Sequence, residues 1–220
     1  MARIGVLTSD FKFYHDVIEL LKSWDLPFVS LSEPSFQPPD VNVVLSSSRD
    51  CFNTSNQFKG ETPLDALRSS LASLFYKEKF ETLTIGIDPG PYPGVAVFAD
   101  EILMEAFECT SREELPNHVS KIISSYPFSK LQVKIGNGDI PNRDFIIKGL
   151  MALNLNIKIV DEKNTSFPHK IHDNALSAAR IAATERRYIH SGPFSNVRRK
   201  NMFEREFKTL KSQMRNSSNL

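Results

Sequence analysis

Residues 85–97 read IGIDPGPYPGVAV, and this stretch decides how the middle of the chain folds. An acid, Asp88, ends an apolar run, and prolines and glycines follow before a second β-branched run begins. That order predicts a hairpin that presents Asp88 at its mouth, where a carboxylate can bind a metal ion. The same residues also suit an ordinary turn, because Asp-Pro and Pro-Gly are common in turns.

The composition limits the class of protein. The chain has 220 residues, 40% of them hydrophobic, which suffices for one sizeable core or two small ones. It has no apolar run of transmembrane length, and it begins with a strand-like segment rather than a signal peptide, so we expect a cytoplasmic protein. Cys51 and Cys109 lack metal-ligand spacing, which argues against a disulfide scaffold or a cysteine zinc site.

The N-terminal part, residues 1–60, is predicted to be a small α/β domain with a parallel sheet. Its predicted elements are a strand, a helix and two further strands, at residues 4–7, 14–24, 28–31 and 41–45. The polar loop Thr8-Ser9-Asp10 suits capping of the helix, or binding of a ligand at the helix N-terminus. Residues 49–62 are rich in Asn, Ser and Lys and are interpreted as a loop or linker.

The second part, residues 61–190, alternates strands and helices more regularly. Leucines at helical spacing lead into the hairpin, which a third strand follows. The predicted elements after it are helix, strand, helix, strand and helix, at residues 112–125, 131–135, 143–153, 157–160 and 171–187. Residues 191–220 are predicted to be a basic helical extension.

Acids follow three of the predicted strands: Asp88, Asp139 after a glycine turn, and the pair Asp161-Glu162. Carboxylates that converge at strand ends are typical ligands of Mg²⁺ or Mn²⁺. A further acid, Asp173, opens the last helix. Asp139 equally suits the N-cap of the helix that follows it, and Glu162 suits an ion pair with a neighbouring lysine.

The second part resembles a known family. Residues 85–90 resemble the first strand of RuvC-type Holliday-junction resolvases and their YqgF-like relatives in the RNase H-like superfamily. Residues 159–166 are similar to the Asp-Glu strand end of the YqgF branch, and residues 173–179 resemble its terminal helix. The resemblance covers residues 83–187, and it implies an RNase H-like mixed-sheet domain after the small α/β domain.

The resemblance implies a metal-dependent nuclease that hydrolyses phosphodiesters of DNA or RNA with Mg²⁺ or Mn²⁺. The residues that match its catalytic and metal-binding acids are Asp88, Glu162 and Asp173, with Asp139 as a further candidate metal ligand. Basic residues near the C-terminus are candidates for contact with the phosphate backbone, namely Arg186, Arg187, Arg198, Arg199 and Lys200. Symmetric cutting of a junction would require a homodimer.

Two positions favour a second hypothesis. The RuvC pattern has a glutamate where this chain has Gly136, and the acid of the last helix could align with Asn174 instead of Asp173. A neutral amide there would weaken metal binding, which would leave a catalytically inactive module that binds nucleic acid or protein. The Gly-Ile-Asp turn also resembles the phosphate loops of actin-like ATPases, but the chain is too short for their two domains.

Overall fold

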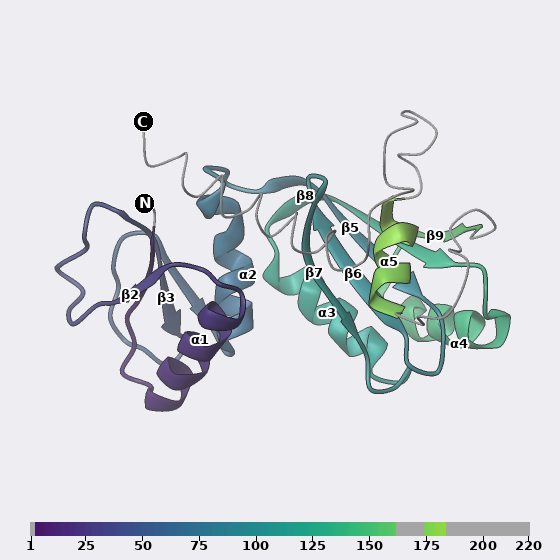
Figure 1. Cartoon of the computed structure of the whole chain (residues 1–220), viewed down its shortest axis with the longest axis horizontal. Helices are drawn as coiled ribbons and strands as arrows, with labels where there is room; N and C mark the ends of the chain where they lie inside the picture. The colour runs from purple at the N-terminus through teal and green to yellow at the C-terminus, as the bar shows by residue number, and fades with distance from the viewer. Residues whose placement is uncertain (1–2, 162–173, 184–220) are drawn as a thin grey trace. The chain divides into compact units, whose positions relative to one another are not determined.

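The computed structural model describes residues 3–161 and 174–183 (Figure 1). The chain divides into two compact units. Among the described residues, the first comprises residues 3–79 with 124–127, and the second comprises residues 80–123 with 128–161 and 174–183. The boundary predicted from the sequence is at residue 60, and the helix that follows that position belongs to the first unit. None of the helices in the described ranges combines the length and apolar character needed to cross a lipid bilayer.

The first unit is built on a parallel sheet. Its strands are β1 (Arg3–Val6), β2 (Phe28–Ser30), β3 (Val41–Ser47) and β4 (Gln57–Gly60). They pair in the order β2-β1-β3-β4, and every pairing is parallel. The central strands β1 and β3 consist mainly of buried aliphatic residues, as expected for parallel strands that are covered on both faces.

Two helices of this unit contact each other, and α2 packs on β3 and β4 (Figure 1). Helix α1 (Phe11–Ser23) buries Phe13, Val17 and Leu21, which recur at helical spacing. Helix α2 (Pro63–Leu74) begins with a capping box, in which the Thr62 hydroxyl accepts from the Asp65 amide and the Asp65 carboxylate accepts from the Thr62 amide.

The other face of this sheet is covered by loops. Gly5 points to that face, because a Cβ built on it would meet Leu31, Val41 and Val44. Leu31 and Phe52, from the loops after β2 and β3, pack on the cluster that contains Val41 and Val44. In the described residues, both of these connections lack a helix. The first unit is therefore an open parallel α/β sheet with helices on one face and loops on the other.

The second unit contains a mixed sheet of five strands. They are β5 (Phe80–Asp88), β6 (Gly94–Ala99), β7 (Ile102–Glu108), β8 (Phe128–Gly136) and β9 (Ile157–Val160). The order is β7-β6-β5-β8-β9, with β5, β6 and β7 antiparallel and β5, β8 and β9 parallel. This agrees with the predicted hairpin and third strand followed by strands that alternate with helices.

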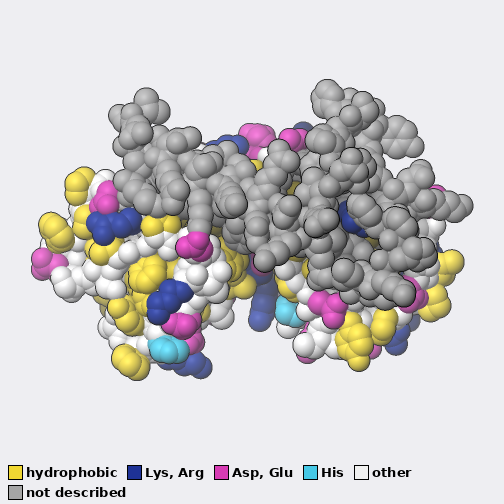
Figure 2. Space-filling model, in the orientation of Figure 1, with side chains coloured by type: hydrophobic (Ala, Val, Ile, Leu, Met, Phe, Trp, Pro, Cys, Tyr) yellow, Lys and Arg dark blue, Asp and Glu magenta, His cyan; other side chains and the backbone are white. Residues whose placement is uncertain are grey.

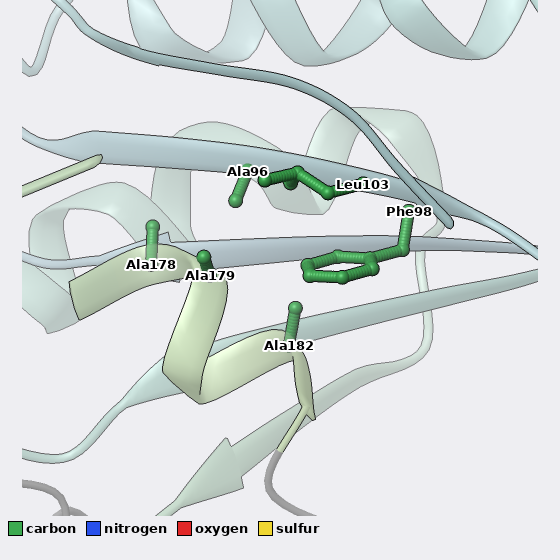
Figure 3. Close-up of a cluster of buried hydrophobic side chains, with 6 residues drawn as sticks. All are labelled: Ala96, Phe98, Leu103, Ala178, Ala179 and Ala182. Carbon is green, nitrogen blue, oxygen red and sulfur yellow. The ribbon is translucent and has the colours of Figure 1, made fainter. Parts of the chain in front are cut away.

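Helix α5 (Asn174–Ala183) lies very close to one face of this sheet. Its residues Ala178, Ala179 and Ala182 pack on β6 and β7 (Figure 3). Gly86 permits the close approach, because a Cβ there would lie 2.2 Å from the carbonyl oxygen of Ala178. Beside it in β8, buried Lys134 donates from Nζ to the carbonyl oxygen of Ala182 at 2.8 Å.

The opposite face carries the helices that connect the later strands. Helix α3 (Leu115–Ser125) is in contact with β7, where His118 lies against the ring of Phe107. Helix α4 (Ile140–Leu150) approaches α3 closely, because a Cβ on Gly149 would lie 2.9 Å from the side chain of Pro116. A short 3₁₀ turn, Met151–Leu153, then leads to β9.

The coarse fold class predicted from the sequence is confirmed: an α/β chain with one parallel and one mixed sheet. One element was predicted wrongly, because β4 lies inside residues 49–62, which were interpreted as a linker. The strand Gln57-Phe58-Lys59-Gly60 has a single large apolar side chain and is an edge strand. It therefore lacks the run of β-branched residues on which strand prediction depends.

Candidate functional site

The candidate site lies at the carboxyl ends of β1 and β3 in the first unit. In open α/β sheets, ligands bind outside the carboxyl ends of the strands where the strand order reverses. In the order β2-β1-β3-β4 that place is between β1 and β3. The loop after β1 carries Thr8, Ser9 and Asp10, and the chain after β3 carries Arg49 and Asp50.

Asp50 joins these two segments. One carboxylate oxygen accepts from the Ser9 amide at 2.8 Å and from the Ser9 hydroxyl at 2.6 Å. The other oxygen accepts from the Ser47 amide at 2.9 Å. The Thr8 hydroxyl also contributes to the lowered pKa of this carboxyl. Asp50 is only 4% exposed, so these bonds form away from bulk water.

The electrostatics of Asp50 favour its charged form. Burial raises the pKa of this carboxyl, but the hydrogen bonds from the hydroxyls of Ser9 and Thr8 and from two backbone amides lower it by more. The net pKa therefore lies below its ordinary value. The carboxylate is therefore ionised at neutral pH, and hydrogen-bond donors stabilise its charge.

Both carboxylate oxygens of Asp10 also accept hydrogen bonds. Its Oδ1 accepts from the Phe13 amide at 3.0 Å and caps α1, as the sequence predicted. Its Oδ2 accepts from the Ser47 hydroxyl and from exposed Arg49, both at 3.3 Å. The amide of Phe13 is the largest cause of a lowered pKa of Asp10, with smaller contributions from Ser47 and Arg49.

Strand β4 adds a cation to the same edge. Lys59 donates from Nζ to the backbone oxygen of Asp50 at 2.8 Å and to the side-chain oxygen of Asn53 at 3.3 Å. The loop after β3 is thus tied to β1 through Ser9 and to β4 through Lys59. We call Thr8, Ser9, Asp10, Ser47, Asp50 and Lys59 the edge cluster.

The edge cluster does not fit a magnesium ion. A carboxylate has about four lone-pair sites, and in Asp50 the Ser9 amide, the Ser9 hydroxyl and the Ser47 amide already use three of them. Asp10 has donors on both oxygens. Mg²⁺ needs oxygen ligands with free lone pairs in octahedral geometry. Across residues 3–161 and 174–183, His, Cys, Asp and Glu side chains do not gather in threes in a metal-binding arrangement.

Comparison with protein families gives a match in this unit. Residues 3–74 match the response regulator receiver-like domain. The match covers β1 to α2, and it therefore contains the whole edge cluster. Receiver domains hold Mg²⁺ at their phosphorylation site. A comparison with curated proteins finds no match.

The receiver-like match corrects the assignment to the RNase H-like superfamily. The matched family belongs to signalling proteins and not to RuvC-type or YqgF-like nucleases, so the predicted nuclease function was wrong. The alternative, a catalytically inactive RNase H-like module that binds nucleic acid or protein, is corrected with it. The resemblance had rested on residues 83–187, whereas the match lies in the N-terminal part, to which the sequence had assigned no chemistry.

The second unit places only some of the predicted site residues. Asp88 ends β5 as predicted, and its neighbours in the sheet are Gly94 and then Glu108. Asp139 is the N-cap of α4, where its carboxylate accepts from the Asn142 amide at 3.2 Å. This agrees with the capping alternative. Hydrogen bonds to Asn142 lower the pKa of Asp139.

The other predicted acids, Glu162 and Asp173, lie outside the described residues. At the start of α5, Asn174 donates through its amide to the Tyr92 carbonyl oxygen at 2.7 Å and to a Glu108 oxygen at 2.8 Å. A neutral donor thus occupies the position next to Asp173 and joins the helix to the sheet. A metal ion at Asp88 stays a prediction.

The predicted nucleic-acid contacts also lie outside the described ranges, namely Arg186, Arg187, Arg198, Arg199 and Lys200. On the face drawn in Figure 2, the described surface shows acidic and basic side chains intermingled. Binding of nucleic acid through the basic segment and formation of a homodimer stay predictions.

Proposed function

We propose that this chain is a signalling protein of the response-regulator type, with residues 3–74 as its receiver-like module. The observation that carries the proposal is the coincidence of the matched residues with an open parallel α/β unit. The polar edge cluster of that unit lies where such sheets bind ligands. A cytoplasmic location, predicted from the sequence, suits this function and can be tested by fractionation.

The edge cluster supports the proposal because it couples separate segments. Asp50 connects the loop before α1 to the end of β3. Lys59 of β4 donates to the backbone oxygen of Asp50 and so links β4 to the same loop. A partner that binds one arrangement of these loops more tightly than another would shift the population of both loops together. A signalling module must then pass that shift to a second site, and the coupling free energy measures the transfer.

The test is whether a change in the edge cluster reaches the second unit. Ser9→Ala removes the hydroxyl that donates to Asp50, and the matched control Ser69→Ala removes a hydroxyl that donates to the Ala66 carbonyl within α2. We expect Ser9→Ala in the full chain to alter hydrogen exchange of β5 and β8 amides by about fivefold, and Ser69→Ala to leave them unchanged. Identical exchange in both variants would refute the proposal.

A further inference from the structure

The fate of Asp50 distinguishes two kinds of signalling module. In one kind, the acid at the carboxyl edge of the sheet is reversibly phosphorylated. In the other kind, its hydrogen bonds make it a fixed part of the fold. A phosphoryl acceptor needs a carboxylate oxygen that can reach the phosphorus of a donor molecule. It also needs room for the phosphoryl group and for the cation that neutralises its charge.

Asp50 lacks both requirements. It is 4% exposed, and Ser47 beside it is 2% exposed, so a donor molecule cannot approach without opening of the loop. One of its oxygens lies 2.6 Å from the Ser9 hydroxyl, and the other accepts from the Ser47 amide. Formation of an acyl phosphate at Asp50 would join one of these oxygens to the phosphorus of the donor molecule and expel the leaving group of that donor. Internal donors would then lose a charged acceptor.

The two cations near Asp50, Lys59 and Arg49, also donate hydrogen bonds within this edge of the sheet. Lys59 donates to the backbone oxygen of Asp50 and to Asn53, and Arg49 donates to Asp10. These bonds hold the loop that contains Asp50 in the arrangement that buries its carboxylate. The hydrogen bonds of Asp50, Lys59 and Arg49 thus hold the two loops together.

We infer that Asp50 is a structural clasp, and that the receiver-like unit works without an aspartyl phosphate and without bound Mg²⁺. The inference rests on the proposed signalling function and specifies how that function is regulated. Signals then enter this unit by binding of a partner to the closed edge, because covalent modification of Asp50 would have to break the clasp.

The experiment uses the full chain with a small phosphoryl donor, acetyl phosphate, in the presence of Mg²⁺. Intact mass is measured for the wild type and Asp50→Asn, and thermal unfolding is measured with and without Mg²⁺. We expect no phosphoryl adduct on Asp50 and no change of Tm with Mg²⁺. A phosphoryl adduct in the wild type that is absent from Asp50→Asn, or a Mg²⁺-dependent rise in Tm that this variant loses, would overturn the inference.

The clasp itself is tested by stability. We expect Asp50→Asn to lower the Tm of the first unit by about 5 °C or more, since an amide cannot accept from all of these donors. The matched control Asp16→Asn changes an exposed carboxylate on α1 and should leave Tm unchanged. Should Asp50→Asn fail to fold, Ser9→Ala provides the milder test, and a Tm equal to that of Asp16→Asn would refute the clasp.

The two proposals can fail separately. Unchanged exchange in the second unit, together with the absence of a phosphoryl adduct on Asp50, would remove the signalling proposal and leave the clasp in place. An adduct at Asp50 would remove the clasp and leave the coupling between the units in place.

Discussion

Replacement of Gly86 by alanine should detach helix α5 from its sheet. The added Cβ would lie 2.2 Å from the carbonyl oxygen of Ala178 and 2.8 Å from the amide nitrogen of Ala182. Ordinary van der Waals contact begins at 3.4 Å, so the helix backbone would have to retreat by more than 1 Å. A rigid backbone cannot rotate away as a flexible side chain can, and the strain is therefore at the upper end of overpacking costs.

We expect Gly86→Ala to lower the free energy of unfolding of the second unit by about 3 kcal/mol. The retreat would also lengthen the hydrogen bond from Lys134 to Ala182. Native-state hydrogen exchange of the β5 amides measures the loss, and the expected increase in their opening equilibrium is about 100-fold.

Gly90→Ala is the matched control. It introduces the same methyl group in the turn after β5, where the nearest atoms to the new Cβ lie 4.0 Å away and where φ is not positive. This variant should be neutral, or stabilising by up to about 1 kcal/mol through the unfolded state. Equal exchange of β5 amides in Gly86→Ala and Gly90→Ala would refute the argument that α5 depends on the absence of a Cβ at Gly86.

Three further predictions concern other groups. The pKa of Asp50 is lower in the folded state, so its contribution to stability is present above the unfolded pKa of about 3.9 and is lost as pH falls through the folded value. Acid unfolding followed by Trp24 fluorescence should therefore show a flatter dependence of stability on pH in Asp50→Asn than in the wild type. Burial and the nearby Glu114 and Glu108 raise the pKa of Cys109 to about 11. Iodoacetamide at pH 8 should therefore label exposed Cys51 and leave buried Cys109 unmodified, as measured by peptide mass analysis. Lys134→Met should destabilise the second unit by about 1–2 kcal/mol in urea unfolding followed by circular dichroism, because the last turn of α5 loses a donor.

The sequence predicted the central strands well because each carries several buried aliphatic residues within a short segment. Strand β3 is a run of valine and leucine, and strand β5 carries isoleucine and leucine up to Asp88. Such runs can be buried only in the interior of a sheet. Edge strand β4 was missed, since Lys59 and Gln57 act through hydrogen bonds that no hydrophobic pattern reveals.

The candidate site was predicted poorly for a related reason. The loop Thr8-Ser9-Asp10 was interpreted as a helix cap or as a ligand site at the helix N-terminus, and Asp50 fell in a segment that was interpreted as a loop or linker. The partners Ser9 and Asp50 are 41 positions apart, so only pairing of β1 with β3 brings them together. The sequence did contain one signal: an acid shortly after a buried strand, at the edge where parallel sheets bind ligands.

The strand pairing of β5 sets the order in which the second unit can fold. On one side β5 pairs with β6, which follows it after a short turn, and on the other side Phe80 pairs with Phe128, 48 positions later. Closure of a short loop costs less chain entropy and is faster than closure of a long one. We therefore expect the meander of β5, β6 and β7 to form first and to serve as the template on which β8 docks.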